Sequence, residues 1–508
     1  MKKVKKISLL FLIVVIISTI FFGCSQQKIT IEEPYNGRVF YEIFVRAFND
    51  SNHDGIGDLK GVTQKLDYLK DIGIKGIWLM PINESPSYHG YDVSDYYKIN
   101  PDYGTMDDYK ELIRQAHKRD IKVEMDMVIN HTSTENAWFK AGSTDKDSKY
   151  KNYYLWTSDQ NVATEVSTIG TQPWTPLGKE YYYSLFSSGM PDLNYDNKDV
   201  RNEMKKIAKF YLDMGVDGFR LDAAMWIYNE NAKNVAWWKE YNDYIKSINK
   251  NAVITGEVWQ SNSKIISQYY KSLDSCFNFP LADAIVKGVQ SGSSSSIMGA
   301  INYAYESYKA VNKSFVDSPF ITNHDMNRSM DTFQDLDPAK QAAAMLITLP
   351  GTPYVYYGEE TGMTGSKPDE QIRQPFIWEN KDLSKNSTWE ASTNDLNKVA
   401  VSVQSKDKES LLNFYKTFIN LRNNSNALKF GDFKDLEAEN DGVVSYKRNY
   451  KNEQVEIYIN VGRYKVQENI DFKKAKVLYS NKETVKSMRF NGKVSLDTYE
   501  ILVLEKIN

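Results

Sequence analysis

Three carboxylate residues with the chemistry of sugar cleavage each follow a short apolar run of the sequence. Cleavage of a glycosidic bond needs one carboxyl group that protonates the leaving oxygen and a second that attacks the anomeric carbon or activates water. Runs of about four to eight apolar residues are typical of buried strands, so these acids are expected at strand ends. The pattern favours a glycoside-cleaving site made by Asp222, Glu257 and Asp325.

The elements that must position these acids alternate along the chain. Strand-like runs are separated by helical segments, such as the one in which Val62, Leu66, Leu69 and Ile72 share a face. This alternation predicts a (β/α)8 TIM barrel, whose chemistry lies at the carboxyl ends of its strands. The eight expected strands cover residues 40–44, 76–80, 122–129, 216–221, 252–257, 275–279, 320–324 and 354–357.

Two stretches break this alternation. From about Thr132 to Met190 the sequence is polar, rich in Tyr, Trp, Asp, Thr and Gly, and too long for an ordinary loop, so we expect a small inserted domain after the third strand. From about Phe430, short alternating segments predict an antiparallel β-sandwich. The expected divisions are a signal peptide at 1–23, a tether at 24–33, the barrel at 34–131 and 191–429, the inserted domain at 132–190 and the sandwich at 430–508.

The composition argues against nucleic acid as a partner. The chain of 508 residues has a formal net charge of −3, and its basic leader makes the remainder more acidic still. A basic surface is the footprint of nucleic-acid binding, so none is expected here. The two cysteines provide no disulfide framework, and Cys276, which lies in an apolar run, is expected to be a buried free thiol.

The first residues resemble an export signal. Basic residues at 1–6 precede an apolar stretch at 7–22, which is too short for a spanning helix. Gly23-Cys24 then resembles a bacterial lipoprotein signal, in which the exposed cysteine is acylated, although Phe21 stands where Leu is usual. We expect Cys24 to anchor the protein to the outer face of the cell membrane. The alternatives are an ordinary signal peptide, which implies secretion, and an uncleaved anchor.

A loop after the first expected strand carries alternating oxygen donors around a central glycine. Hard oxygen ligands at alternating positions can wrap one Ca²⁺ ion, with a backbone carbonyl among them. The loop resembles an EF-hand, but Gly61 replaces the bidentate Glu of the twelfth position, which excludes a full EF-hand. The alternative is an Asx-rich turn without metal. The expected Ca²⁺ ligands are Asp50, Asn52, Asp54, the carbonyl of Ile56, and Asp58.

Six short segments resemble, in order, the motifs of the α-amylase family of retaining glycoside hydrolases. Any one match arises often by chance, whereas six in order at suitable spacing do not. The resemblance runs from about Tyr35 to the C-terminus. The segment 190–194, combined with the calcium loop, resembles the group of this family that is intermediate between oligo-1,6-glucosidases and neopullulanases. The segments are 126–131, 190–194, 218–222, 256–259, 320–325 and 351–360.

The resemblance implies roles for the three acids. Asp222 would be the nucleophile that forms a glycosyl ester, Glu257 would protonate the leaving oxygen and later deprotonate water, and Asp325 would stabilise the distorted sugar. Arg220, which shares a strand face with Asp222, would keep the nucleophile ionised. We expect a raised pKa for the acid that must be protonated near neutral pH.

Sugar-binding roles follow from the same resemblance. Tyr91 would stack on the ring beside the scissile bond, and His131 and His324 would hydrogen-bond sugar hydroxyls. A lone histidine is more often structural, and the convergence of motifs outweighs that alternative here. Further expected substrate contacts are His89, Asp92, Arg220 and Arg373.

The segment before Tyr91 bears on where a glucan chain would be cut. In the exo-acting α-glucosidases of this family, an Asp three residues before the Tyr pairs with an Arg and closes the pocket; here Tyr88 stands there and Arg373 lacks that partner. We therefore expect endo-acting hydrolysis of starch and maltooligosaccharides. The segment Ala223-Ala-Met-Trp226 departs from the Ala-x-Lys-His of many α-amylases. Alternatives are neopullulanase-like, cyclomaltodextrinase-like or oligo-1,6-glucosidase activity, transglycosylation, and an inactive surface starch-binding protein.

Overall fold

The computed structural model describes residues 35–167, 169–470, 472–482 and 487–507. The chain divides into two units, Met1–Tyr35 and Asn36–Asn508. The leader and Cys24 lie outside the described residues, so what was predicted for them stays a prediction. Among the described residues, no helix is both long enough and apolar enough to cross a membrane.

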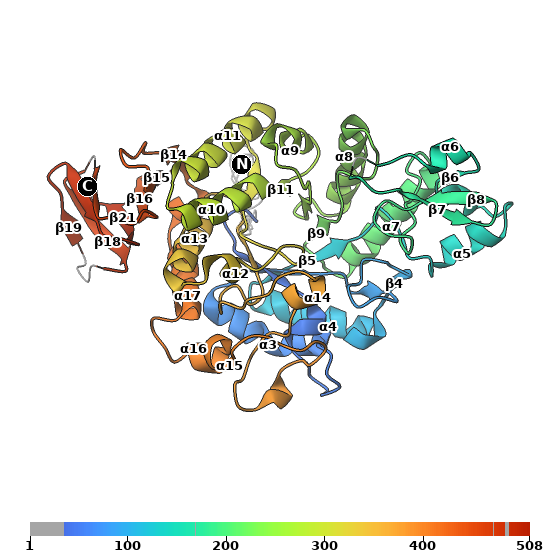
Figure 1. Ribbon diagram of the computed structural model, residues 1–508, viewed down its shortest axis with the longest axis horizontal. Helices are drawn as coiled ribbons and strands as arrows, with labels where there is room; N and C mark the ends of the chain where they lie inside the picture. The colour runs from blue at the N-terminus through green and yellow to red at the C-terminus, as the bar shows by residue number, and fades with distance from the viewer. Residues whose placement is uncertain (1–34, 168, 471, 483–486, 508) are drawn as a thin grey trace, which may run out of the picture. The chain divides into compact units, whose positions relative to one another are not determined.

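A parallel sheet of eight strands forms the centre of the second unit (Figure 1). Neighbouring strands in space are mostly neighbours in the sequence, as in a barrel. The ends of the sheet meet because the backbone N–H groups of Thr352 and Tyr354 donate to the carbonyls of Asp317 and Pro319 at 2.8 and 2.9 Å. The strands are β1 (Phe40–Ile43), β2 (Gly76–Leu79), β5 (Lys122–Met127), β9 (Gly218–Leu221), β10 (Val253–Gly256), β11 (Ser275–Phe277), β12 (Val316–Ser318) and β13 (Tyr354–Tyr356).

Helices cover the outside of the sheet, and their sequences explain their limits. Asp58 caps the first of them by accepting from the Gly61 N–H, and Gly73 ends it in the left-handed conformation at φ 97°. Its buried face carries Val62, Leu66 and Leu69, as the periodicity predicted. The long helices are α3 (Leu59–Ile72), α4 (Met106–Lys118), α7 (Lys198–Asp213), α8 (Asn231–Ile248), α9 (Ser263–Tyr269), α10 (Phe279–Ser291), α11 (Ser295–Val311), α13 (Leu336–Thr348) and α17 (Leu411–Asn424).

The seventh strand was predicted at the wrong place. The structure puts β12 at Val316–Ser318, and the run predicted at 320–324 follows it as an irregular segment. The strand holds the buried polar residue Asp317, and Pro319, which cannot donate a hydrogen bond, ends it. Apolarity therefore indicated the wrong run: Phe320 and Ile321 are buried at the mouth of the barrel without being part of its ladder.

The segment after β5 forms a small layer of its own. A three-stranded antiparallel sheet in the order β6-β8-β7 lies in this segment, and an isolated bridge between His131 and Asp192 joins the two ends of the segment. The segment carries the aromatic residues that set it apart in the sequence. Its elements are α5 (Ala137–Thr144), a 3-10 turn (Lys151–Tyr153), β6 (Trp156–Thr157), α6 (Gln160–Ala163), β7 (Trp174–Leu177) and β8 (Glu180–Tyr183).

The C-terminal part is antiparallel, as predicted. A six-stranded sheet in the order β14-β15-β16-β21-β18-β19 faces a two-stranded ribbon, β17-β20, and a second hydrophobic core that includes Tyr458, Phe472 and Leu504 fills the space between them. The strands are β14 (Asp432–Asp435), β15 (Val443–Tyr450), β16 (Glu453–Asn460), β17 (Val466–Asn469), β18 (Lys474–Ser480), β19 (Ser487–Arg489), β20 (Lys493–Leu496) and β21 (Ile501–Lys506).

Cys276 is buried and free, as expected. Short elements complete the connections between the strands and helices. These elements are α2 (Val45–Phe48), β3 (Asn83–Glu84), β4 (Asp95–Ile99), a 3-10 turn (Pro101–Tyr103), α12 (Ser329–Phe333), α14 (Asp369–Ile372), a 3-10 turn (Leu383–Lys385), α15 (Leu396–Val399), α16 (Val401–Gln404) and α18 (Asn426–Phe430).

Candidate active site

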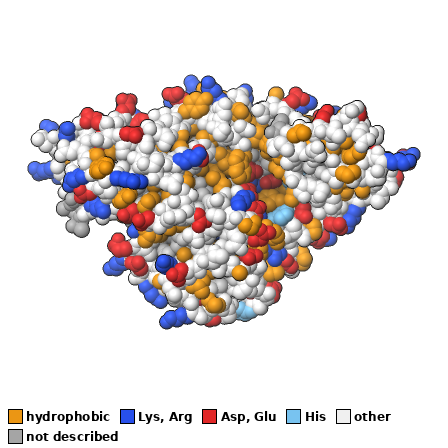
Figure 2. All heavy atoms as spheres, viewed as in Figure 1, with side chains coloured by type: hydrophobic (Ala, Val, Ile, Leu, Met, Phe, Trp, Pro, Cys, Tyr) orange, Lys and Arg blue, Asp and Glu red, His pale blue; other side chains and the backbone are white. Residues whose placement is uncertain are grey.

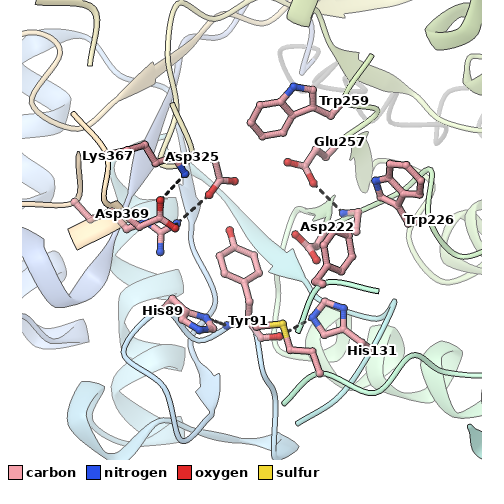
Figure 3. A pocket seen from close by; sticks show the side chains of 14 residues that line it. His89, Tyr91, His131, Asp222, Trp226, Glu257, Trp259, Asp325, Lys367 and Asp369 are labelled. Atoms are coloured by element: carbon pink, nitrogen blue, oxygen red, sulfur yellow. Dashed lines mark hydrogen bonds and ion pairs between the residues drawn. The ribbon is translucent and has the colours of Figure 1, made fainter. Parts of the chain in front are cut away.

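A cleft of about 380 Å³ opens at the carboxyl ends of the barrel strands. Figure 2 shows apolar and acidic side chains gathered around a hollow on this face, and Figure 3 shows the cleft from close by. The three predicted acids lie in its wall together. The lining residues are His89, Tyr91, His131, Phe186, Met190, Asp222, Ala223, Trp226, Glu257, Trp259, Asp325, Lys367, Asp369 and Arg373.

One guanidinium group, that of Arg220 on β9, joins three carboxylates behind the cleft. Its Nη1 lies 2.8 Å from Asp222 Oδ1 and 2.9 Å from Asp126 Oδ1, and its Nη2 lies 2.8 Å from Glu257 Oε1. The arginine side chain is 1% exposed, so water screens these contacts poorly. Because β5, β9 and β10 are neighbours in the sheet, residues at or just after their ends meet at one guanidinium. A single positive charge therefore faces three acids.

The hydrogen bonds indicate which of these acids holds a proton. The pKa of both Asp126 and Glu257 is raised to about 7, mainly by burial, with the negative charge of Asp222 adding to the shift and the positive charge of Arg220 opposing it. Asp126 accepts hydrogen bonds from Arg220, Trp78 Nε1 and the Tyr91 hydroxyl, all of which favour its ionised form. Glu257 accepts only from Arg220 and the Ala223 N–H. Fewer donors therefore oppose a proton on Glu257 than on Asp126, which suits Glu257 to the work of a general acid.

Asp325 lies in the opposite electrostatic environment. His324 Nε2 lies 3.0 Å from its Oδ2, and Arg373 Nη2 donates to its Oδ1 at 2.9 Å. The imidazolium and the guanidinium hold the pKa of Asp325 well below its usual range despite burial, which acts in the opposite direction. Asp325 is therefore a fixed negative charge in the wall of the cleft, suited to stabilising positive charge on a sugar ring.

Tyr91 forms the floor beside these acids. Its ring stacks on the imidazole of His324 at 5.5 Å and 10°, and its hydroxyl lies 2.6 Å from His324 Nε2. The Tyr91 carbonyl contacts His131 Nε2 at 3.0 Å, and its N–H donates to His89 Nδ1 at 3.1 Å. Burial lowers the pKa of His89 and of His131, so both are neutral imidazoles near pH 7. The segment 89–91 thus brings one aromatic face and one histidine to the cleft, and its backbone holds a second histidine, His131, beside them.

Three of the predicted substrate contacts lie behind the wall of the cleft. Arg220 and His324 are 1% and 0% exposed, and the two Nη atoms of Arg220 and both ring nitrogens of His324 already contact protein groups. Asp92 is not part of the lining; its Oδ1 accepts from the hydroxyls of Ser85, at 2.6 Å, and Ser87. In this structure these residues hold the lining in place, and His89, Tyr91, His131 and Arg373 are the predicted binding residues that reach it.

Arg373 has partners that the sequence did not reveal. Besides Asp325, its Nη2 donates to Asp369 Oδ2 at 3.1 Å, and its Nε donates to the carbonyl of His324 at 3.0 Å. Tyr88, which occupies the position where an acid was considered, stacks on Trp389 at 5.3 Å. The acids that pair with Arg373 are thus Asp325 and Asp369, the latter in α14, and both lie far along the chain from Tyr88.

Apart from Ala223, six lining residues were not predicted from the sequence. Phe186 and Trp259 expose 42% and 44% of their surface, which is unusual for large apolar side chains and leaves their faces open to a ligand. The aromatic composition of the inserted segment and the exposed Trp after Glu257 were the available signals. The six are Phe186, Met190, Trp226, Trp259, Lys367 and Asp369.

The predicted calcium loop folds around its own carboxylates. Asp50 Oδ1 accepts from the N–H of His53 at 2.7 Å, and its Oδ2 from that of Gly55 at 2.7 Å. The side chains of Asn52 and Asp54 contact each other at 2.9 Å, and Gly55 takes φ +95°, the sharp turn such a loop needs. Asp and Asn oxygens are of the type that hard cations prefer, and here they bind donors of the loop itself. Among the described residues, this loop included, no group of three or more His, Cys, Asp or Glu is arranged to hold a metal ion.

Comparisons with known proteins agree with this geometry. Residues 42–431 match the model of the α-amylase catalytic domain. The chain is 42% identical to α-amylase 3 of Dictyoglomus thermophilum over 93% of this chain and 94% of that protein, and 29% identical to an oligo-1,6-glucosidase of Bacillus cereus over 92% and 98%. The crystal structure of an α-amylase from H. orenii superposes with a TM-score of 0.87 at 40% identity, covering 92% and 99% of the two chains. With its acids at the strand ends of a (β/α)8 barrel, the chain belongs to the α-amylase family of glycoside hydrolases.

Proposed function

We propose that this enzyme cleaves internal α-1,4-glucosidic bonds of starch and maltooligosaccharides with retention of configuration. The observation that carries the proposal is the pair Asp222 and Glu257, which bind the two terminal nitrogens of one buried guanidinium at 2.8 Å each. Double displacement requires two acids in one site, a carboxylate that attacks the anomeric carbon and a carboxyl group that gives a proton to the leaving oxygen.

The chain's own residues support each step of this reaction. Asp222 Oδ attacks the anomeric carbon while Glu257 gives its proton to the departing glycosidic oxygen, which leaves a glycosyl ester on Asp222 and a free 4-hydroxyl on the leaving chain. Glu257, now ionised, takes a proton from water, whose oxygen attacks the same carbon and releases Asp222 as carboxylate. Asp325 and the face of Tyr91 lie where they stabilise the positive charge that develops on the ring between the two bonds.

Endo-action is supported by the walls of the cleft. Trp259, which follows β10, and Phe186, in the inserted segment, have exposed aromatic rings in the walls. Tyr88, at the position where an acid would close an exo-acting pocket, packs on Trp389. The test is the time course of products from soluble starch. Early release of mixed maltooligosaccharides supports endo-action, whereas glucose as the sole early product contradicts it.

Activity on α-1,6 bonds or transfer between glucans is the second candidate. It is favoured by 35% identity to a 4-α-glucanotransferase of Thermotoga neapolitana, over 73% of this chain and 84% of that protein, and by Met225-Trp226 in place of the Lys-His of many α-amylases. Panose from pullulan, or products longer than the substrate in maltotriose digests, supports this candidate. No product from either glucan would favour a starch-binding protein without catalysis.

A structural calcium ion in the loop at 50–58 is part of the proposal. Asp50, Asn52, Asp54, the carbonyl of Ile56 and Asp58 would hold it, with Asp58 also capping α3. The ion would tie the loop after β1 to α3 and supplies no chemistry to the reaction. The assignment is tested by measuring whether Ca²⁺ raises the Tm of the protein.

Attachment to the outer face of the cell membrane through acylated Cys24 is proposed from the leader alone. A lipid anchor would keep the products of starch cleavage near the cell. In the full-length protein expressed in a bacterial host, Cys24→Ser should move activity from the detergent phase to the aqueous phase in Triton X-114 partitioning. Activity in the detergent phase for both proteins would contradict acylation at this residue.

A further inference from the structure

The face of the barrel opposite to the cleft carries a set of unpaired lysines. Each of them lies in the last turn of a barrel helix or in the loop between that helix and the next strand, so the topology places them all at the amino ends of the strands. All are exposed, and in the described part of the chain none is within ion-pair distance of a carboxylate. This set, the basic rim, consists of Lys70, Lys118, Lys250, Lys271, Lys309 and Lys313.

The acids of the same turns and loops are neutralised. Each of them forms an ion pair with a lysine that is not part of the rim, at 2.6 to 3.0 Å. The pairs are Asp71–Lys416, Asp120–Lys75, Asp213–Lys209, Asp217–Lys122 and Asp274–Lys246. The positive charge of the rim is therefore left without compensation by the acids of its own face.

The rim lysines follow the order of the barrel strands. Lys250, Lys271 and Lys313 precede β10, β11 and β12, which are neighbours in the sheet, and Lys70 and Lys118 precede the neighbours β2 and β5. Charges on one face add their fields, while salt screens each of them beyond about 10 Å. A partner that lies flat against the whole face would therefore gain most from the rim.

The chain enters the barrel on this same face. The Gly37 N–H donates to the carbonyl of Gly351 at 3.2 Å, and Arg38 Nη1 donates to that of Lys75 at 3.3 Å. Gly351 and Lys75 lie just before β13 and β2, at the amino ends of these strands. The chain that precedes Asn36 is thus joined to the barrel on the side of the rim, whereas the cleft opens at the carboxyl ends.

The charge of the rest of the protein restricts the shape of an anionic partner. The formal net charge of the chain is −3, and Asp222, Asp325 and Asp369 line the cleft. A polyanion that wrapped around the molecule would meet these acids, whereas a flat anionic surface meets the lysines of one face alone. A bilayer with anionic headgroups is such a surface, and it attracts nearby lysines.

We propose that the basic rim docks on the anionic lipid headgroups of a membrane, with the cleft turned away from the bilayer. In this orientation the cleft is open to glucans in the medium. The contact is electrostatic and is made by the barrel itself, so it requires neither glucan hydrolysis nor acylation of Cys24. Failure of the proposed function and failure of this contact are therefore distinguishable.

Vesicle sedimentation at low ionic strength tests the contact. Residues 36–508, which form a compact unit of their own, should bind vesicles of phosphatidylcholine and phosphatidylglycerol in equal parts but not vesicles of phosphatidylcholine alone. A lysine near an anionic bilayer strengthens binding about fivefold, so Lys250→Glu, Lys271→Glu and Lys313→Glu together should weaken it by roughly 100-fold or more. Equal binding to both kinds of vesicle, or equal binding by the parent and the triple variant, overturns the proposal.

A second triple variant is the matched control. Lys146→Glu, Lys179→Glu and Lys381→Glu make the same change of charge at exposed lysines, two in the inserted segment and one after β13. This variant should keep most of the binding of the parent. Circular dichroism checks that both variants are folded. A control that loses as much binding as the rim variant would show that net charge, and not the rim, determines the contact.

Acetylation by an amine reagent, read by mass spectrometry, measures the orientation. With the mixed vesicles present, the rim lysines should react several-fold more slowly, while Lys146, Lys179 and Lys381 react as they do without vesicles. Equal protection of the two sets contradicts the orientation. Duplex DNA is the competing partner for a basic face: binding to DNA without binding to vesicles would overturn the lipid assignment.

Discussion

His324 Nδ1 lies 2.6 Å from Glu42 Oε1, and both side chains are almost completely buried. Glu42 comes from β1, and in the closed barrel only β13 separates β1 from β12, the strand before the loop that carries His324. The other imidazole nitrogen faces Asp325 and the Tyr91 hydroxyl. The charges of Asp325 and Glu42 raise the pKa of His324 to about 9 against the effect of burial. Glu42 is thus a positioning residue that acts on Asp325 through a charged imidazole.

The first prediction concerns this contact. Glu42→Gln removes one of the two carboxylates that stabilise the imidazolium, so the pKa of His324 should fall, and part of the neutral-pH population should lose its proton. NMR titration of the five histidines, with His324 assigned from His324→Gln, measures the shift directly. The groups that face His324 are Asp325, Glu42, Tyr91 and Asp126, together with Arg373 through the His324 carbonyl.

Glu456→Gln is the control for this prediction, because Glu456 is equally buried but lies in β16 and accepts from Tyr458 at 2.7 Å. We expect Glu42→Gln to lower kcat as well, since the ring beside Asp325 loses its positive charge in part of the population and only Arg373 then remains as a charged partner. A His324 titration that is the same in wild type and Glu42→Gln would show that the glutamate does not set the charge of the ring.

The second prediction concerns the nucleophile. Asp222→Asn keeps the size of the side chain but removes its ability to form an ester, so kcat on starch should fall by at least about 10³-fold. Asp213→Asn, an exposed acid at the end of α7, should leave kcat within about twofold, as is usual for surface substitutions. Full hydrolysis by Asp222→Asn would mean that another group attacks the anomeric carbon.

Local pattern was enough to place the acids but not their partners. Asp222 and Glu257 follow directly after β9 and β10, so an apolar run and the residue after it suffice to predict their position. Asp369 lies only four positions before its partner Arg373. Glu42 and Asp126, in contrast, join the site through His324 and Arg220, which are 282 and 94 positions away in the chain. No periodicity within one element encodes such pairings.

The seventh strand was predicted at the wrong residues because its burial also depends on a contact between distant parts of the chain. β12 is short and contains a buried Asp, because Asp317 accepts from the Asn278 amide at 3.0 Å inside the barrel. Its Oδ1 has no partner among the described residues, and burial raises the pKa of Asp317 to about 7, so this strand accepts a buried acid that an apolarity scan counts as surface. The strand was predicted to begin four residues too late. Asp325 nevertheless follows the strand in both cases, and it lines the cleft.

The third prediction concerns stability and a buried arginine outside the cleft. Arg422 of α17 is 0% exposed and donates to the carbonyls of Gly37, Ile347, Leu349 and Gly351 at 2.6 to 2.9 Å. Arg422→Met would leave these carbonyls without their donor, so the free energy of unfolding should fall by about 3 kcal/mol or more. The measurement is the urea midpoint followed by tryptophan fluorescence. Arg114→Met, an exposed residue, serves as control, and equal midpoints for the two variants would contradict the argument.

The fourth prediction tests the calcium loop. An ion that binds only the folded protein raises stability by mass action, so Ca²⁺ in excess should raise the Tm of the leaderless enzyme relative to EDTA. Asp54→Ala should abolish the rise, because Asp54 is an exposed loop residue whose carboxylate otherwise contacts only Asn52 and Ile56. Asp107→Ala, an exposed acid of α4, should keep it. A Tm that does not respond to Ca²⁺ in the parent would favour the metal-free turn.

The last prediction follows from the proton on Glu257. Burial is the largest cause of its raised pKa, and the charges of Asp222 and Asp325 add to it against the opposing charge of Arg220. Since the free enzyme needs this proton to expel the leaving chain, kcat/KM should be high below the pKa and decline above about pH 7.

Glu257→Gln separates this group from Asp126, which has a similar pKa. The variant cannot donate a proton, so its kcat/KM on maltooligosaccharides should fall by about 10²- to 10⁴-fold and lose the decline above neutral pH. An α-maltosyl fluoride, whose leaving group needs no protonation, should lose much less in formation of the ester. A decline at the same pH in Glu257→Gln would assign the titration to Asp126, and because Asp126 binds Tyr91 and Arg220, the pH dependence would then report the positioning of the site instead of proton transfer.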